Sequence, residues 1–138
     1  MAEDRSELLS EAFWAVARRL RGLSRETLAP WDISPSQSRA LGVLMRHDQL
    51  RLSELSEYLH IAPRSATEVV DGLAERGLAE RRPDPTDRRA TLVTLTTAGR
   101  HAGGQIQQAR TDEAERFFAA LSQHDREQLA RILRTLNP

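Results

Sequence analysis

The segment 53–99 constrains the fold of this chain more than any other part, because two short helices are followed there by a hairpin. Ser53–Leu59 spaces its leucines four residues apart, as an amphipathic helix requires, and Pro63 begins a second helix. A proline and aspartate cluster at 83–87 predicts a turn, and the alternating stretch 91–96 predicts the returning strand. This order is typical of a winged helix-turn-helix, whose second helix enters a DNA major groove.

The hairpin is rich in arginine. It begins with the extended stretch 78–82, and between Arg81 and Arg89 it holds four arginines against two aspartates. The whole chain has no net charge, with 20 basic and 20 acidic residues, so the distribution of charge and not its total favours a nucleic-acid partner. A charged hairpin on its own is most simply a solvated turn. Its place directly after a helix-turn-helix favours an arginine tip that enters a minor groove.

The first two turns of the second helix hold short hydroxyl side chains beside one arginine, which suits close approach to base edges. Arg64 can reach guanine O6 and N7, and Thr67 can meet a thymine methyl. Glu68 either accepts from a cytosine amino group or pairs with a nearby arginine. A capped surface helix without a ligand would have the same pattern. The DNA-contact candidates in this helix are Pro63, Arg64, Ser65, Thr67 and Glu68.

Two other places supply candidates for DNA contact. At the hairpin tip these are Asp87, Arg88 and Arg89, with Asp87 expected to orient an arginine, and Asp71 is expected to pair with a hairpin arginine. The sequence 34–37 predicts a helix start with a capping box, where Ser36 and Gln37 lie beside free N–H groups that can receive a phosphate. An ordinary helix cap explains those two residues equally well.

Long predicted helices flank this central segment, at 7–28, at 97–121 with a bend at Gly103–Gly104, and after Ser122. Together they hold more apolar residues than a small winged domain would bury. The stripes either fold back on the core or form a self-complementary dimer surface, which we favour because helix-turn-helix proteins usually read two half-sites. The candidates for the dimer interface are Leu8, Leu9, Phe13, Phe117, Phe118, Ile132, Leu133 and Leu136.

Composition excludes several classes of protein. The 138 residues suffice for one domain, and the absence of cysteine excludes disulfides, thiolate metal sites and thiol-based sensing. The histidines at 47, 60, 101 and 124 lack the spacing of a helical metal site, which leaves only a site assembled from distant segments. No phosphate loop, activated nucleophile or carboxylate cluster is present, so we predict neither an enzyme nor a cofactor. The lack of a long apolar run and the acidic start predict a cytoplasmic protein.

These motifs together resemble the MarR family of bacterial transcriptional regulators. The resemblance rests on the sequence of 72–82, on the Asp87-x-Arg89 wing and on the Leu95-Thr96-x-x-Gly99 helix start, in the family's order and spacing. It implies a mainly α fold with a small β-hairpin wing, an obligate homodimer, and a recognition helix at 63–76. The implied parts are an N-terminal dimerisation helix at 1–33, a winged helix-turn-helix DNA-binding domain at 34–96, and C-terminal dimerisation helices at 97–138.

The resemblance also implies repression of transcription at an inverted-repeat operator, relieved by a small aromatic or phenolic ligand. The family's ligand cleft lies between the dimer helices and the DNA-binding lobe. Candidate lining residues here are Trp14, Arg18, Trp31 and Met45, with ordinary packing as the alternative. A different class remains open, a winged-helix protein-interaction module without specific DNA binding. Zero net charge and Glu68, where many relatives have arginine or another polar group, favour that alternative, and the arginine-rich wing argues against it.

Overall fold

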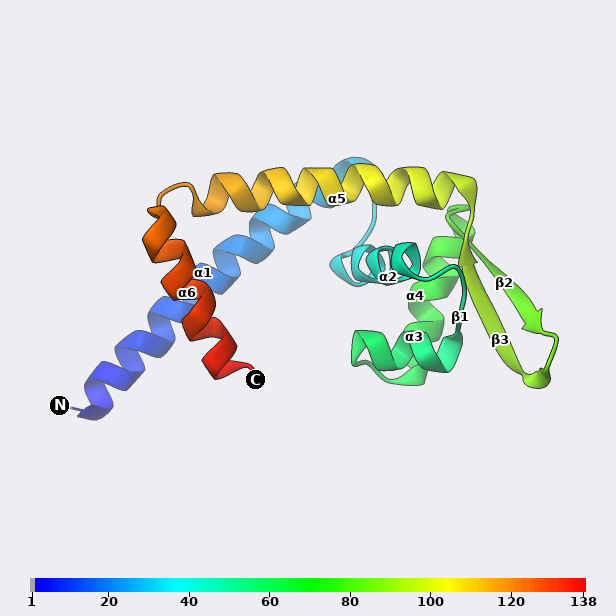
Figure 1. The fold of residues 1–138 in the computed structure, drawn as a ribbon, viewed down its shortest axis with the longest axis horizontal. Coiled ribbons are helices and arrows are strands. Elements are labelled where there is room, and N and C mark those ends of the chain that lie inside the picture. The colour runs from blue at the N-terminus through cyan, green and yellow to red at the C-terminus, as the bar shows by residue number, and fades with distance from the viewer. Residues whose placement is uncertain (1) are drawn as a thin grey trace.

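The computed structural model describes residues 2–138 and shows an elongated molecule with two distinct ends (Figure 1). A lobe of three short helices and a small sheet occupies one end. The N-terminal half of the first helix, the last helix and both chain termini lie at the other end. The long helix α5, Thr97–Phe118, runs between the two ends. The mainly helical fold with a β-hairpin wing confirms the predicted fold class.

The helices and strands follow one another in the predicted order. The helices are α1 (Ala2–Leu28), α2 (Pro35–Arg46), α3 (Leu52–Leu59), α4 (Pro63–Glu75), α5 and α6 (Gln123–Leu136), with a 3₁₀ turn, η1, at Ala29–Trp31. The strands are β1 (Leu50–Arg51), β2 (Ala79–Asp84) and β3 (Asp87–Leu95). They form one antiparallel sheet in the order β1-β3-β2. No helix within residues 2–138 is both long and apolar enough to span a membrane.

The structure differs from the prediction at several boundaries. The first helix begins at Ala2 and not at residue 7, and β1 was not predicted because two residues carry no periodicity. The hairpin turn is shorter than the predicted five residues, since Pro83 pairs with Thr91 inside the sheet. Proline is tolerated there because β2 is an edge strand. The predicted bend at Gly103–Gly104 was wrong, because α5 is one unbroken helix that ends at Phe118.

Side-chain caps fix the helix starts that the sequence predicted. Ser34 Oγ accepts a hydrogen bond from the Gln37 N–H at 3.1 Å, and Gln37 Oε1 accepts from the Ser34 N–H at 2.9 Å, which completes the capping box. Thr96 Oγ1 accepts from the Gly99 N–H at 2.9 Å and donates to the Gly77 carbonyl at 2.6 Å. The start of α5 is thereby tied to the root of the hairpin.

The apolar core lies in the lobe that contains α2, α3, α4 and the sheet. Its fully buried large side chains include Leu41, Leu44, Leu55, Leu73, Val70 and Val93. Burying each such side chain contributes about 1.5–3 kcal/mol to stability. In contrast, α6 has no buried residue and α1 buries only Leu28. The single chain therefore has a packed core at one end and exposed apolar helices at the other.

Two glycines of α5 lie in opposite environments, and this predicts opposite effects of alanine. A Cβ at Gly99 would collide with the backbone carbonyl of Leu78, whereas a Cβ at Gly104 would meet no atom within 4 Å. We expect Gly99→Ala to destabilise the protein by about 1–3 kcal/mol, because the carbonyl cannot rotate away like a side chain. Gly104→Ala is expected to stabilise it by about 0.5–1 kcal/mol. Urea unfolding measures both, and equal effects of the two changes would contradict this account.

Candidate nucleic-acid interface

The helix α4 presents one face to the core and the opposite face to solvent. Ala66, Val70 and Leu73 are fully buried, at the spacing of four and three residues that one helix face requires. Arg64 and Ser65 are exposed on the outer side of the first turn. The predicted recognition helix is therefore held by its inner face, and its N-terminal outer face is open.

Two residues of this outer face, Thr67 and Glu68, differ in whether their polar groups already have a partner in the chain. Thr67 is half-buried and its Oγ1 donates to the Pro63 carbonyl at 3.1 Å, so its hydroxyl is engaged within the helix. Glu68 is exposed and forms no ion pair with any part of the chain that the structure describes. Of the two roles considered for Glu68, pairing with an arginine of its own chain is therefore not observed.

An ion pair joins the recognition helix to the root of the wing. Arg81 of β2 pairs with Asp71 of α4, as the sequence predicted, and Arg81 Nη2 also donates to the Thr67 carbonyl at 3.3 Å. Both groups are partly exposed, so the ion pair itself contributes little to stability. Its effect is geometric, because it fixes β2 against one side of α4.

The wing tip is a two-residue turn, Pro85–Thr86, braced by an aspartate on each side. Asp84 Oδ1 accepts from the Thr86 N–H and from the Thr86 hydroxyl, each at 2.8 Å. Asp87 Oδ1 accepts from the Arg89 backbone N–H at 2.9 Å. Asp87 was expected to orient one of the tip arginines, and its contact in the structure is with the backbone N–H of Arg89. Arg88 and Arg89 follow this turn with exposed side chains.

Asp84 also forms an ion pair that the sequence analysis missed. Arg51 Nε lies 2.8 Å from Asp84 Oδ2, and the Asp84 side chain is only 6% exposed. Hydrogen bonds from the Thr86 N–H and hydroxyl, and then the charge of Arg51, hold the pKa of Asp84 below its ordinary value despite its burial. No sequence signal indicated this pair, because Arg51 lies in the two-residue strand β1.

The start of α2 places Ser36 and Gln37 differently. Ser36 is exposed, but the Gln37 side chain is used in the capping box and packs against Gly72 of α4. A Cβ at Gly72 would collide with the Gln37 side-chain nitrogen. Gln37 therefore joins α2 to α4 in this structure, and Ser36 is the residue of the two that faces solvent.

The four ligand candidates do not come together in the single chain. Trp14 lines a shallow depression with Glu7 and Glu11, and Arg18 is exposed further along α1. The Trp31 Nε1–H donates to the Gln105 side chain at 3.5 Å, and the Trp31 ring packs against the core.

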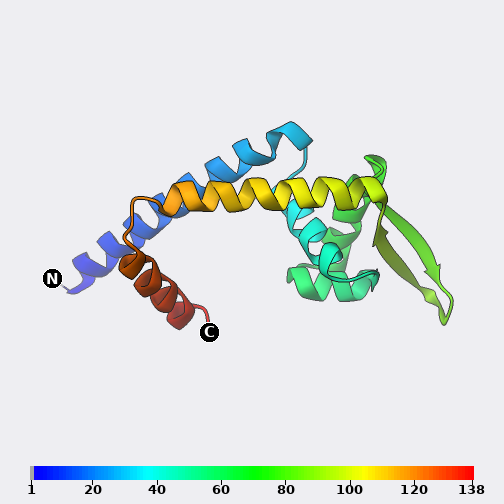
Figure 2. The same ribbon diagram turned by 45° about the horizontal axis from the view of Figure 1, so that its top comes forward.

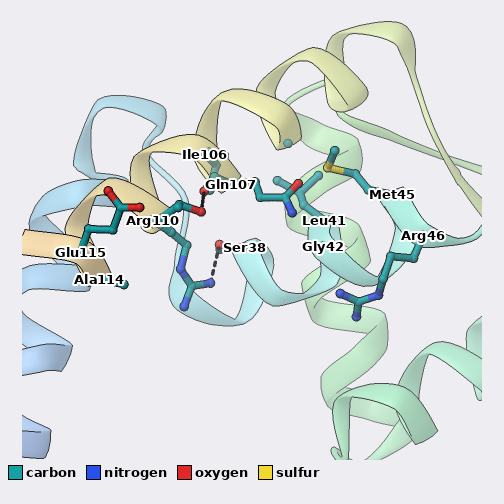
Figure 3. Close-up of a pocket in the computed structure, with 12 residues that line it drawn as sticks. Ser38, Leu41, Gly42, Met45, Arg46, Ile106, Gln107, Arg110, Ala114 and Glu115 are labelled. Carbon is teal, nitrogen blue, oxygen red and sulfur yellow. Dashed lines mark hydrogen bonds between the residues drawn. The ribbon is translucent and has the colours of Figure 1, made fainter. Parts of the chain in front are cut away.

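Met45 lines a separate cavity of about 570 Å³ between α2 and α5 (Figure 3). Arg46 and Arg110 also line it, and Arg110 Nη1 donates to Ser38 Oγ at 3.2 Å. The cavity thus combines apolar walls with two cationic side chains and the carboxylate of Glu115. Within residues 2–138, no three side chains of the types that bind metals are grouped as a metal site.

The dimer candidates comprise six exposed residues and one half-buried aromatic pair. Among the residues more than a third exposed are Leu8, Leu9, Phe13, Ile132, Leu133 and Leu136, with Leu9 at 72% and Leu136 at 70%. Phe117 and Phe118 are half-buried and pack edge to face at 4.9 Å, with the Arg19 guanidinium 5.4 Å from the Phe117 ring. So many large apolar side chains exposed together are unusual on a surface that remains in water.

Comparison with known proteins agrees with this architecture. Residues 31–90 match the sequence model of the MarR family. The chain is 30% identical over 116 residues to a protein assigned as transcriptional regulatory protein for the hcr operon of Thauera aromatica, covering 84% of this chain and 70% of that protein. It is 25% identical over 118 residues to the HTH-type transcriptional repressor MdtR of Bacillus subtilis, covering 86% and 76% of the two chains.

A solved structure extends the comparison to three dimensions. A MarR variant from E. coli in complex with operator DNA matches with a TM-score of 0.84 at 27% identity, covering 94% of both chains. This chain therefore belongs to the MarR family. Its relatives and structural neighbours are transcriptional regulators, which confirms the expectation of a regulator and not an enzyme.

The surroundings of Asp84 predict its titration. We expect its carboxyl to titrate below the ordinary value of 3.8, because Thr86 and Arg51 stabilise the charged form. This stabilisation is fully present above the unfolded pKa and is lost as the pH falls through the lower folded pKa. Carbon-13 NMR of the Asp84 carboxyl measures the midpoint, and Arg51→Met should raise it. A midpoint at or above 3.8 in the unaltered protein would contradict the assigned contacts.

Proposed function

We propose that this protein is a dimeric repressor that binds an inverted-repeat operator through α4 and the wing. One observation carries the proposal. The exposed outer face of α4 and the arginine-rich hairpin are joined at the root of the hairpin, where Arg81 contacts Asp71 and the Thr67 carbonyl. A helix and a basic ribbon with fixed relative positions can contact a major groove and the adjacent minor groove together.

Each proposed contact follows from the surroundings of its side chain. Arg64 is free to reach a guanine, with Ser65 and Pro63 beside it at the helix start. Thr67 offers its methyl, because its hydroxyl is bonded within the helix. Glu68 has no arginine partner in the described chain, which favours acceptance from a cytosine amino group.

The phosphate and minor-groove contacts are assigned to three residues. Ser36 is exposed in the first turn of α2, where N–H groups attract a phosphate. Arg88 and Arg89 are assigned to the minor groove, and Asp87 holds the Arg89 backbone in place. Gln37 acts through the fold and positions α2, since its side chain is already engaged.

The dimer is assigned to the exposed apolar residues of α1, α5 and α6. α6 has no fully buried residue in the single chain, and both termini lie at the same end of the molecule (Figure 1). A second copy related by a two-fold axis would cover these stripes with its own and would place two winged lobes on one duplex. On this proposal 1–33 and 97–138 serve dimerisation, and 34–96 serve DNA binding.

Release by a small aromatic acid or phenol is assigned to the cavity between α2 and α5 (Figure 3). Met45 offers an apolar contact, and Arg46 and Arg110 offer charge to an anionic group. α2 belongs to the DNA-binding lobe, while α5 continues to the dimer end. A ligand that separates these helices would therefore change the spacing of the two lobes. The second candidate function, an interaction module, is favoured by the zero net charge and by Glu68, and the arginine-rich wing argues against it.

Binding to DNA across a salt series separates these two functions. The purified protein is titrated with DNA from upstream of its own coding sequence and with random DNA of equal length. A DNA-binding repressor is expected to protect a pseudo-palindrome, with affinity falling by about 0.9 log units per log unit of salt for each neutralised phosphate. Binding no tighter than to random DNA at every salt concentration would favour the interaction module.

Replacing the wing arginine tests the surface directly. Arg89→Ala is expected to weaken operator binding about five- to tenfold and to lower the salt slope by about one, because one cationic contact is lost. Arg5→Ala is the matched control, since it removes the same charge from an exposed position at the far end of the molecule. Equal affinities of the two variants in a gel-shift or anisotropy titration would remove the wing from the interface.

A charge in the stripe of α6 tests the dimer. Leu133→Asp is expected to dissociate or unfold the dimer, because a carboxylate would be buried in an apolar interface. Arg131→Asp introduces a carboxylate roughly 160° from Leu133 and about 100° from Ile132 on the same helix, and should leave the dimer intact. Light scattering at several concentrations measures the oligomeric state of both variants, and circular dichroism shows whether each variant is folded. A folded Leu133→Asp dimer of unchanged affinity would place the interface elsewhere.

A further inference from the structure

The wing contacts the helix-turn-helix at two places along the length of the hairpin. At its root, Arg81 pairs with Asp71 of the recognition helix. Near its tip, Arg51, Asp84 and Thr86 form a second connection, which we call the wing-tip contact. Arg51 lies in β1, directly before α3, so this contact reaches from the first helix of the motif to the turn of the hairpin.

The wing-tip contact is built around one buried carboxylate. Asp84 Oδ2 receives Arg51 Nε at 2.8 Å, while Asp84 Oδ1 receives the N–H and hydroxyl of Thr86, each at 2.8 Å. Arg51 Nη2 also lies 3.5 Å from Thr86 Oγ1. The Asp84 side chain is 6% exposed, so its charge needs this arginine as a partner. The Arg51 backbone N–H is itself bonded to Glu54 Oε1 at 2.9 Å, which anchors Arg51 at the start of α3.

The sheet explains why the tip needs such a contact. β1 pairs with β3 only at Leu92 and Val93, so the hairpin beyond these residues is a two-stranded ribbon. Figure 2 shows this ribbon projecting away from the helices. A two-stranded hairpin is marginally stable by itself in water, and its tip would otherwise move relative to α4. Arg88 and Arg89 lie in this ribbon, directly after the turn that Asp84 and Thr86 brace.

We propose that Arg51 and Asp84 are positioning residues for DNA binding, whose ion pair sets where Arg88 and Arg89 lie relative to the recognition helix. The inference rests on the proposed function, because it assigns the wing arginines to DNA. The Arg51 guanidinium is directed at a carboxylate of its own chain, so its contribution passes through the wing. Asp84 is expected to strengthen DNA binding although its charge is negative. The proposal therefore predicts the direction in which the affinity changes when that charge is removed, and this sign differs from the one expected from charge alone.

The variant Asp84→Asn tests that sign. Removing a negative charge from a DNA-binding surface should strengthen binding if charge alone matters. If Asp84 positions the wing, the same change should weaken operator binding about fivefold, because the ion pair with Arg51 is lost. Glu80→Gln is the matched control, since Glu80 lies on the same strand and, within residues 2–138, pairs only with the neighbouring Arg82. Equal or tighter binding by Asp84→Asn, like that of Glu80→Gln, would overturn the proposal.

A double-mutant cycle separates positioning from a general loss of stability. In an Arg88→Ala, Arg89→Ala background, Asp84→Asn should have no further effect on affinity, because the residues it positions are gone. The same fivefold loss in both backgrounds would assign Asp84 a purely structural role and overturn the proposal. Arg51→Met should reproduce the behaviour of Asp84→Asn from the other partner, and Arg51→Lys should restore part of the affinity.

Amide hydrogen exchange of the free protein tests, without DNA, whether the wing-tip contact fixes the tip of the hairpin. Faster exchange at the Thr86 and Arg89 amides in Arg51→Met, but not in Glu80→Gln, is expected if the contact fixes the tip. Unchanged exchange in Arg51→Met would overturn the proposal even where the unaltered protein binds its operator. If the unaltered protein binds no specific DNA, the proposed function fails, and the positioning role fails with it, whatever the exchange rates show of the contact itself.

Discussion

Burial of one face of α4 is the constraint on which the rest of this structure depends. Ala66, Val70 and Leu73 are fully buried, and their burial leaves the outer face of the same helix open to solvent. The neighbouring elements are then placed by reference to α4, with Gln37 packed on Gly72 from α2 and Arg81 paired with Asp71 from the wing. Apolar burial supplies the stability and polar contacts supply the position, as expected from the small energies of partly exposed ion pairs.

The unequal distribution of apolar burial connects this lobe to its proposed biological form. The lobe containing α2, α3, α4 and the sheet has a close-packed core, while α6 has no fully buried residue and α1 has only Leu28. α5 is tightly packed against this lobe at Gly99 and Gly103, and it continues to the end of the molecule that holds α6. A regulator that reads two half-sites needs one part that is rigid alone and another that is completed by a second copy.

Much of the fold follows from local chemistry, and this explains which sequence predictions were accurate. The helices that follow Ser34, Thr96 and Ser122 begin where predicted, because each start is fixed by a cap between residues only three positions apart. The ion pair between Asp71 and Arg81 could also be predicted from the sequence, since a helix and the strand that directly follows it lie close together. The hairpin turn was predicted too long because Pro83 is acceptable in an edge strand, and the sequence does not say which strand is at the edge.

The sequence by itself determined the capped helix starts, the helix α4, the arginine-rich wing and membership of the MarR family, since each is written in contiguous residues. Tertiary structure alone decided which polar groups meet across distant segments. It paired Arg51 with Asp84, set Gln37 against Gly72, and separated Trp14 and Trp31 from the cavity that Met45 and Arg110 line. The physical reason is range, because caps and periodicity act within one helical turn, whereas these contacts depend on how α2, α5 and the sheet pack together.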